Sequence, residues 1–190
     1  MSFLPCLCGA VLAAFCQPQS VAQGDQTRAA NGLVLPRVPV HSAASDLGTA
    51  YGTWAAGDCY KVSFHDGMTF VPYLGADYPH NQPWSWQTTS VTVGGVELLD
   101  RGAAPSTRHT DFRYEYRFGA VTEAYDVLGA GLEQSFVVHA RPAAGDLVVR
   151  GMVRTGCSTR DRGPVHAALR FRDERGDAVI DYGAAFAIDA

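Results

Sequence analysis

The sequence predicts an all-β domain, an antiparallel β-sandwich of jelly-roll-like type with about ten short strands. A period of two residues, which is typical of half-buried strands, runs through Leu132, Gln134, Phe136 and Val138. Turn-forming residues recur at intervals of roughly eight to twelve residues, and no segment shows the period of a long helix. The length of 190 residues suits one domain with a sizeable core.

The first strands are expected at residues 51–54 and 59–64. The dipeptide at 66–67 is Asp-Gly, which predicts a hairpin because it tolerates the positive φ of a type I′ turn. The next strand, residues 68–74, contains Pro72. Proline has no N–H to donate to a ladder, so this strand is expected at an edge or with a bulge.

Residues 84–93 alternate between apolar and polar side chains and are expected to form a strand that turns back at Gly94-Gly95. The same pattern predicts the other strands at residues 96–99, 114–122, 133–140, 146–153, 165–173, 178–182 and 186–188. The chain stops two residues after Ile188. An interrupted last strand indicates that the sequence is truncated at its C-terminal end and is a fragment of a longer protein.

Residues 1–22 are predicted to be a signal peptide, because an uncharged apolar run from Phe3 to Cys16 precedes small residues at Ser20 and Ala22. The run is roughly fourteen residues long, which falls short of the ~20 that a membrane anchor needs. Cleavage after Ala22 would leave a flexible lead-in at 23–44 and a β-sandwich domain at 45–190. The mature protein is therefore expected to be secreted or periplasmic.

Five cysteines are present, and three of them lie in the predicted leader. Cys59 and Cys157 remain, and an oxidising compartment would allow them to form one disulfide. The alternative is a pair of free thiols that are buried or too far apart to meet.

The composition excludes several classes of function. The net charge of −4 argues against nucleic acid or an anionic membrane as a partner once the leader is removed. The six histidines show no metal-binding spacing. Asp173, Asp177 and Asp181 lie at regular intervals, which leaves calcium binding in an extracellular loop as an alternative, but they lack the full spacing of an EF-hand loop. Without a nucleophile elbow or a phosphate-binding loop as well, we expect no metal and no cofactor.

Two constellations point toward carbohydrate. Trp84 and Trp86 lie two apart on one face of a strand and, with Tyr78, can form a platform for sugar rings; the alternative is that they pack in the core. Glu123 and Glu133 can face each other across a hairpin as the carboxylate pair of a glycoside hydrolase. The alternative is that they are solvated strand residues.

Several short runs between Tyr51 and Ala190 form a recognisable set. They are Phe70–Gly75 followed by Pro79, Pro83 and Gly95, then Val121–Asp126, Gly131–Phe136, Gly145–Val149 and Asp181–Gly183. With them the chain resembles an uncharacterised N-terminal β-sandwich module of large secreted bacterial proteins. There the module precedes β-propeller-type or other extracellular repeats. The resemblance implies a sandwich fold and no particular activity.

These observations predict a non-catalytic extracellular module that serves as a structural or interaction domain. Its expected partners are downstream repeats of the same polypeptide or a glycan. The alternatives are a carbohydrate-binding module and, as a third hypothesis, a glycan-active enzyme that uses Glu123 and Glu133. The ligand and the oligomeric state stay open.

Overall fold

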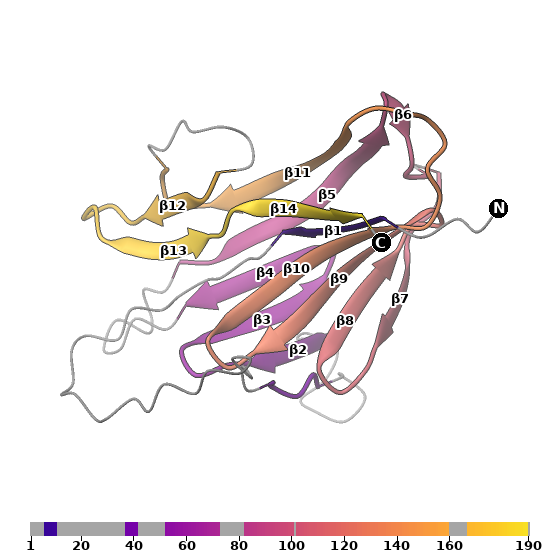
Figure 1. Cartoon of the computed structure of the whole chain (residues 1–190). Helices are drawn as coiled ribbons and strands as arrows, with labels where there is room; N and C mark the ends of the chain where they lie inside the picture. The colour runs from indigo at the N-terminus through magenta and orange to yellow at the C-terminus, as the bar shows by residue number, and fades with distance from the viewer. Residues whose placement is uncertain are drawn as a thin grey trace, which may run out of the picture.

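The computed structural model shows an all-β protein (Figure 1). It describes residues 6–10, 37–41, 52–72, 82–100, 102–159 and 167–189. These residues form fourteen strands, and every strand pairing is antiparallel. The predicted all-β antiparallel class is confirmed. The described part of the chain contains no helix that is long and apolar enough to cross a membrane.

The strands form two large sheets and one hairpin. Sheet A contains β1 (Cys6–Ala10), β7 (Ser106–His109), β8 (Arg113–Arg117), β9 (Val121–Leu128), β10 (Gly131–Val138) and β14 (Ala185–Asp189). Its order is β14-β1-β10-β9-β8-β7. Sheet B contains β2 (Thr53–Ala56), β3 (Tyr60–His65), β4 (Gly67–Pro72), β5 (Trp84–Val93), β6 (Val96–Glu97) and β11 (Leu147–Thr155). Its order is β11-β5-β4-β3-β2, with β6 paired to β5. The hairpin consists of β12 (Leu169–Arg172) and β13 (Ala178–Tyr182).

The connectivity differs from the predicted jelly-roll-like type. Strands β2 to β5 are successive neighbours in sheet B, and β7 to β10 are successive neighbours in sheet A. Two meanders are therefore present, whereas a jelly roll is built from Greek keys. The jelly-roll prediction is wrong because strand spacing reports how many strands exist, not which sheet each one joins.

The local turn signals are placed as predicted. Gly67 has a φ of 93° at the β3–β4 hairpin, and Gly94 and Gly95 have φ values of 56° and 82° between β5 and β6. Pro72 is the last residue of β4, and the ladder between β4 and β5 extends only from Met68 to Phe70. The expected edge position of this strand is wrong, because β4 lies between β3 and β5 in sheet B. Pro72 is tolerated because it lies beyond the part of β4 that has partners on both sides, as its missing N–H requires.

A β-bulge changes which side chains of β5 face the core. The pairing between β5 and β11 shifts register at Arg150, and the hydroxyl of Thr89 donates to the carbonyl of that residue at 3.1 Å. Trp84 is buried on one side of the bulge, and Val91 and Val93 are buried on the other. Because Thr89 is the extra residue of the bulge, even-numbered side chains face the core before it and odd-numbered side chains face the core after it.

The two sheets bury their aromatic side chains against each other. The ring of Phe64 on β3 stacks on Tyr114 of β8 with centroids 4.4 Å apart. Phe64 also contacts Tyr125 of β9 at 5.4 Å. Stacked and tilted ring pairs add specific contacts to the apolar area that they bury.

Two tyrosines connect the sheets in opposite directions. Tyr60 of sheet B donates to the carbonyl of Leu128 at 2.6 Å, beside the β9–β10 turn of sheet A. Tyr116 of sheet A donates to the carbonyl of Gly67 at 2.5 Å, in the β3–β4 hairpin of sheet B. Each hydroxyl satisfies a backbone acceptor of the opposite sheet, which sets the position of one sheet on the other.

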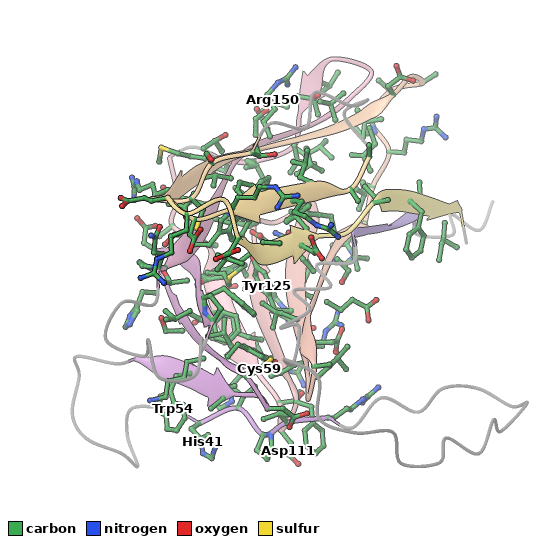
Figure 2. The ribbon with its side chains drawn as sticks, turned by 90° about the vertical axis from the view of Figure 1, so that its left-hand side faces the viewer. His41, Trp54, Cys59, Asp111, Tyr125 and Arg150 are labelled. Atoms are coloured by element: carbon green, nitrogen blue, oxygen red, sulfur yellow. The ribbon has the colours of Figure 1, made fainter. Side chains whose placement is uncertain are left out.

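Residues 37–41 belong to the folded part of the chain, although they lie in the predicted flexible lead-in. The Val40 N–H donates to the carbonyl of Asp111 at 2.7 Å. His41 and Trp54 exchange two backbone hydrogen bonds, and their rings stack with centroids 4.6 Å apart. Figure 2 shows these side chains at one end of the molecule, with Arg150 at the other. This segment links the strand β2 of sheet B to the start of β8 in sheet A.

Strand β1 occupies an interior place in sheet A. It pairs with β10, where Cys8 lies opposite Phe136, and with β14, where Cys8 lies opposite Ala187. The strand falls within the predicted signal peptide, whose other residues lie outside the described ranges. Within the described chain, β14 has no ladder partner other than β1.

Candidate functional site

A cluster of polar side chains lies in the core between sheets A and B. This Glu123 cluster consists of Thr88 on β5, Glu123 and Tyr125 on β9, Gln134 on β10, and Tyr182 on β13. Glu123 is 1% exposed and Gln134 is fully buried. They are buried because successive side chains of a strand point to opposite faces of the sheet. The odd-numbered residues of β9, which include Val121 and Val127, and the even-numbered residues of β10 face sheet B. Tyr125 lies near the middle of the molecule (Figure 2).

The carboxyl group of Glu123 is the common acceptor of the cluster. Its Oε1 accepts from the Tyr125 hydroxyl at 2.5 Å and from Gln134 Nε2 at 2.7 Å. Its Oε2 accepts from the Thr88 hydroxyl at 2.8 Å. The Tyr182 hydroxyl donates to Oε1 of Gln134 at 2.9 Å, which orients the amide toward the carboxyl group. Each of these donors therefore depends on Glu123, directly or through Gln134.

Burial determines the ionisation of this cluster. It raises the pKa of Glu123, and the hydrogen bonds from Tyr125, Thr88 and Gln134 oppose this shift without cancelling it. Burial, followed by the nearby Glu123 carboxyl group, also raises the pKa of Tyr125 and of Tyr182. Both phenols therefore remain protonated donors at neutral pH.

A carboxyl group with a raised pKa is a candidate general acid. Catalysis also requires that a reactant come within hydrogen-bonding distance of the acid. Glu123 and Tyr125 are enclosed by the core, with exposures of 1% and 0%. Their geometry fits a buried network that specifies how the two sheets pack better than it fits an active site.

The predicted carboxylate pair of a glycoside hydrolase is not formed. The β9–β10 register places Glu123 opposite Phe136 and Glu133 opposite Asp126. Glu123 faces the core, whereas Glu133 lies on the other face of sheet A. The prediction is wrong because the two-residue turn at Gly129 sets the pairing and gives the two glutamates opposite orientations.

The two predicted platform tryptophans share one face of β5, but this face is turned to the core. Trp84 is 1% exposed, and its ring contacts Trp86, Phe171 and Tyr182 at centroid distances of 6.4, 5.6 and 5.6 Å. The β12–β13 hairpin supplies the last two rings. The alternative of core packing is the one found for Trp84. Tyr78, the third predicted platform residue, lies outside the described residues.

Gly151 on β11 provides the space that Trp86 occupies. Gly151→Ala is expected to lower the free energy of unfolding by about 1–3 kcal/mol. A Cβ atom at this position would lie 2.1 Å from Cζ2 of Trp86, so the indole would have to move. It would also lose its hydrogen bond from Nε1 to the Thr88 hydroxyl, which is 2.9 Å long.

Urea unfolding followed by tryptophan fluorescence measures this effect. Met152→Ala is the control, because Met152 is on the same strand, is 39% exposed and lies opposite Gln87 rather than Trp86. It is expected to change the stability by less than about 0.5 kcal/mol. An unchanged unfolding midpoint in Gly151→Ala would show that Trp86 does not need this space.

Cys59 and Cys157 are not joined to each other in the structure, so the disulfide that the sequence allowed is not formed. The Cys157 Sγ lies 3.5 Å from Oε1 of Gln82. Burial raises the pKa of the Cys157 thiol, which keeps it in its less reactive protonated form. Both cysteines are half-buried.

A second candidate site is a hollow on the outer face of sheet A, the face turned away from sheet B. Its volume is about 440 Å³. Its polar lining comes from Ser106 on β7, Arg113, Glu115 and Arg117 on β8, Thr122 on β9, and His139 after β10. The strand register places Ser106, Arg117 and Thr122 in one row across the sheet.

Glu115 holds the two arginines of this hollow in place. Its Oε1 accepts from Nε of Arg113 at 3.0 Å, and its Oε2 accepts from Nη2 of Arg117 at 2.7 Å. Burial alone would raise the pKa of Glu115, but the bonds from Arg117 and Arg113 outweigh it and lower the pKa. Arg113 also pairs with Asp126. The Thr122 hydroxyl lies 2.8 Å from Nε2 of His139. The guanidinium groups are thus positioned in advance, with further N–H groups left to bind a ligand.

No protein-family model, characterised protein or solved structure matches this chain. The site must therefore be judged on its own geometry. Sequence reasoning identified Glu123 but missed its partners Thr88, Gln134 and Tyr182, which come from three other strands, β5, β10 and β13. It also missed the hollow. The alternation Arg-Tyr-Glu-Tyr-Arg over Arg113–Arg117 is the local signal that predicts a charged outer face on this strand.

Proposed function

We propose that this chain is a non-catalytic β-sandwich module of an exported bacterial protein, with a structural or interaction role. The observation that carries the proposal is the enclosure of Glu123 and Tyr125, which are 1% and 0% exposed. These two side chains, which could perform acid–base chemistry, instead hydrogen-bond to each other and to Gln134 and Thr88 in the core. A reactant has no route to them through packed side chains.

The sandwich arrangement is supported by contacts that join sheets A and B face to face. They include the stacking of Phe64 on Tyr114 and the reciprocal hydrogen bonds of Tyr60 and Tyr116. Export is supported by the apolar run of residues 3–16. The resemblance to modules of large secreted proteins supports downstream repeats of the same polypeptide as one partner.

The test is turnover of chromogenic glycosides and esters by the purified protein and by Glu123→Gln. We expect no turnover above the rate without protein for either form. A measurable rate that disappears in Glu123→Gln, while circular dichroism shows this variant to be folded, would overturn the non-catalytic role. The variant is informative because the amide keeps the size of the side chain.

Carbohydrate binding is the second candidate function, and the hollow on the outer face favours it. A volume of about 440 Å³ lies in the usual range for small-ligand sites. Fixed guanidinium, carboxylate and hydroxyl groups offer both donors and acceptors, and a sugar hydroxyl can use both. Thr122 is only 7% exposed, so its position is well defined.

Arg117→Ala is expected to weaken the binding of any glycan that occupies this hollow by about tenfold or more, because a charge-assisted hydrogen bond contributes about 1.5–3 kcal/mol. A glycan array identifies the ligand, and isothermal titration then compares the variants. Arg150→Ala is the matched control, since Arg150 lies on β11 in sheet B. Equal losses in both variants would place the binding site elsewhere.

A further inference from the structure

Strand β1 is an interior strand of sheet A, although it lies in the predicted leader. Figure 1 shows β1 between β10 and β14. The ladder to β10 runs over Cys6–Ala10 opposite residues 134–138, and the ladder to β14 runs over the same residues opposite 185–189. Five consecutive residues therefore have partners on both sides. The chain between Ala10 and Arg37 lies outside the described ranges.

This strand lies in the segment that the sequence predicts to be removed on export. Without β1, the 134–138 edge of β10 would present unpaired N–H and C=O groups. β14 would lose the one ladder that joins it to sheet A in the described chain. The β10 edge against which β1 lies is held in place by the core, because Phe136 and Val138 of β10 are only 2% and 3% exposed.

We propose that the place of β1 is a strand-acceptor groove, which binds an extended segment of a partner polypeptide antiparallel to β10 once the leader is cleaved. This inference rests on the proposed export and names the partner of the proposed interaction module. The recognition is β-augmentation, in which the main chain supplies affinity and alternate positions supply specificity.

The present occupant defines the chemistry of the partner segment. Residues 6–10 read Cys-Leu-Cys-Gly-Ala, which are uncharged and mostly small. In the register, positions 6, 8 and 10 lie beside Val138, Phe136 and Gln134, the buried face of β10. On β14, Phe186 and Ile188 are 48% and 45% exposed and offer apolar surface beside the groove. A charged or proline-containing segment would not fit, because proline removes a ladder donor in a central strand.

The experiment uses the full chain with a site-specific protease sequence inserted between Ala22 and Arg37. The folded protein is cut, and a fluorescent peptide with the sequence of residues 3–12 is added under reducing conditions. We expect the labelled peptide to replace the cut segment. Hydrogen exchange of the amides at 134–138 and 185–189 should quicken by about tenfold or more when the segment leaves, and slow again when the peptide binds.

Two further peptides make the proposal falsifiable. The same peptide with Cys8→Pro should neither bind nor slow the hydrogen exchange of β10 and β14. An unrelated uncharged peptide that alternates valine and threonine should bind and should slow this exchange. If only the peptide with the sequence of residues 3–12 bound, the site would be specific for this chain's own β1, and the acceptor role would be overturned. Protection of 185–189 that persists after the cut segment has left would also overturn it. Neither outcome bears on catalysis, so this test fails independently of the non-catalytic role.

Discussion

Glu123→Ala is expected to lower the free energy of unfolding by about 3 kcal/mol. The substitution removes the acceptor shared by Tyr125, Gln134 and Thr88, whose hydrogen bonds to it measure 2.5, 2.7 and 2.8 Å. Buried donors that lose an acceptor carry the full cost of their desolvation. Chemical denaturation monitored by circular dichroism measures the change.

Glu133→Ala is the matched control, since it removes the same side chain from the same hairpin on the opposite face of sheet A. Glu133 is half-buried, and we expect a change of less than about 0.5 kcal/mol. Equal losses for the two alanine variants would show that the hydrogen bonds of Glu123 contribute nothing beyond the side chain's packing. Glu123→Gln keeps the shape and one acceptor oxygen and should therefore fall between wild type and Glu123→Ala.

The raised pKa of Glu123 makes this stability dependent on pH. Above the usual value of 4.5, the unfolded chain has released the proton of this carboxyl group, while the folded protein still binds it. The folded state then binds more protons, so the free energy of unfolding falls as the pH rises through this window. Glu123→Gln lacks this proton. The stability of wild type relative to Glu123→Gln should therefore decrease as the pH rises above about 4.5. A difference that increases with pH would contradict the raised pKa.

Trp84→Ala is expected to lower the free energy of unfolding by about 3–5 kcal/mol, the range for removal of a buried indole. Trp84 contacts Phe171 on β12 and Tyr182 on β13, each at a centroid distance of 5.6 Å. The loss should therefore release the β12–β13 hairpin before the sheets separate. Hydrogen exchange of residues 169–182, together with denaturation, measures both effects.

Val96→Ala serves as the control for Trp84→Ala, because Val96 is 45% exposed on β6. Its effect should stay below about 0.5 kcal/mol. The experiment also separates core packing from a sugar platform. If Trp84→Ala kept its stability and lost only glycan binding, the indole would be a surface platform and the described packing would be wrong.

Local features could be predicted because local chemistry controls them. The alternation on β9 and β10 and the glycine pair at 94–95 depend on residues that are close together in sequence. A positive φ at Gly67 is a property of glycine and needs no tertiary contact. The all-β class and most strand positions follow from such signals.

The Glu123 cluster could not be predicted in this way. Its members come from β5, β9, β10 and β13, which belong to sheets A and B and to the β12–β13 hairpin and meet only in the tertiary structure. The bulge at Thr89 likewise depends on pairing with β11. A period-two pattern identifies the two faces of a strand, but it does not say which of them another sheet will cover.

The amino-acid sequence by itself determined that this chain forms short antiparallel strands joined by glycine turns, because backbone preferences and alternation act over a few residues. Tertiary structure alone decided that Glu123 is buried while Glu133 is not, that Trp84 lies in the core, and that residues 6–10 lie between β10 and β14. The physical reason is register: a shift of one residue in a long-range pairing moves a side chain from the core to the opposite face.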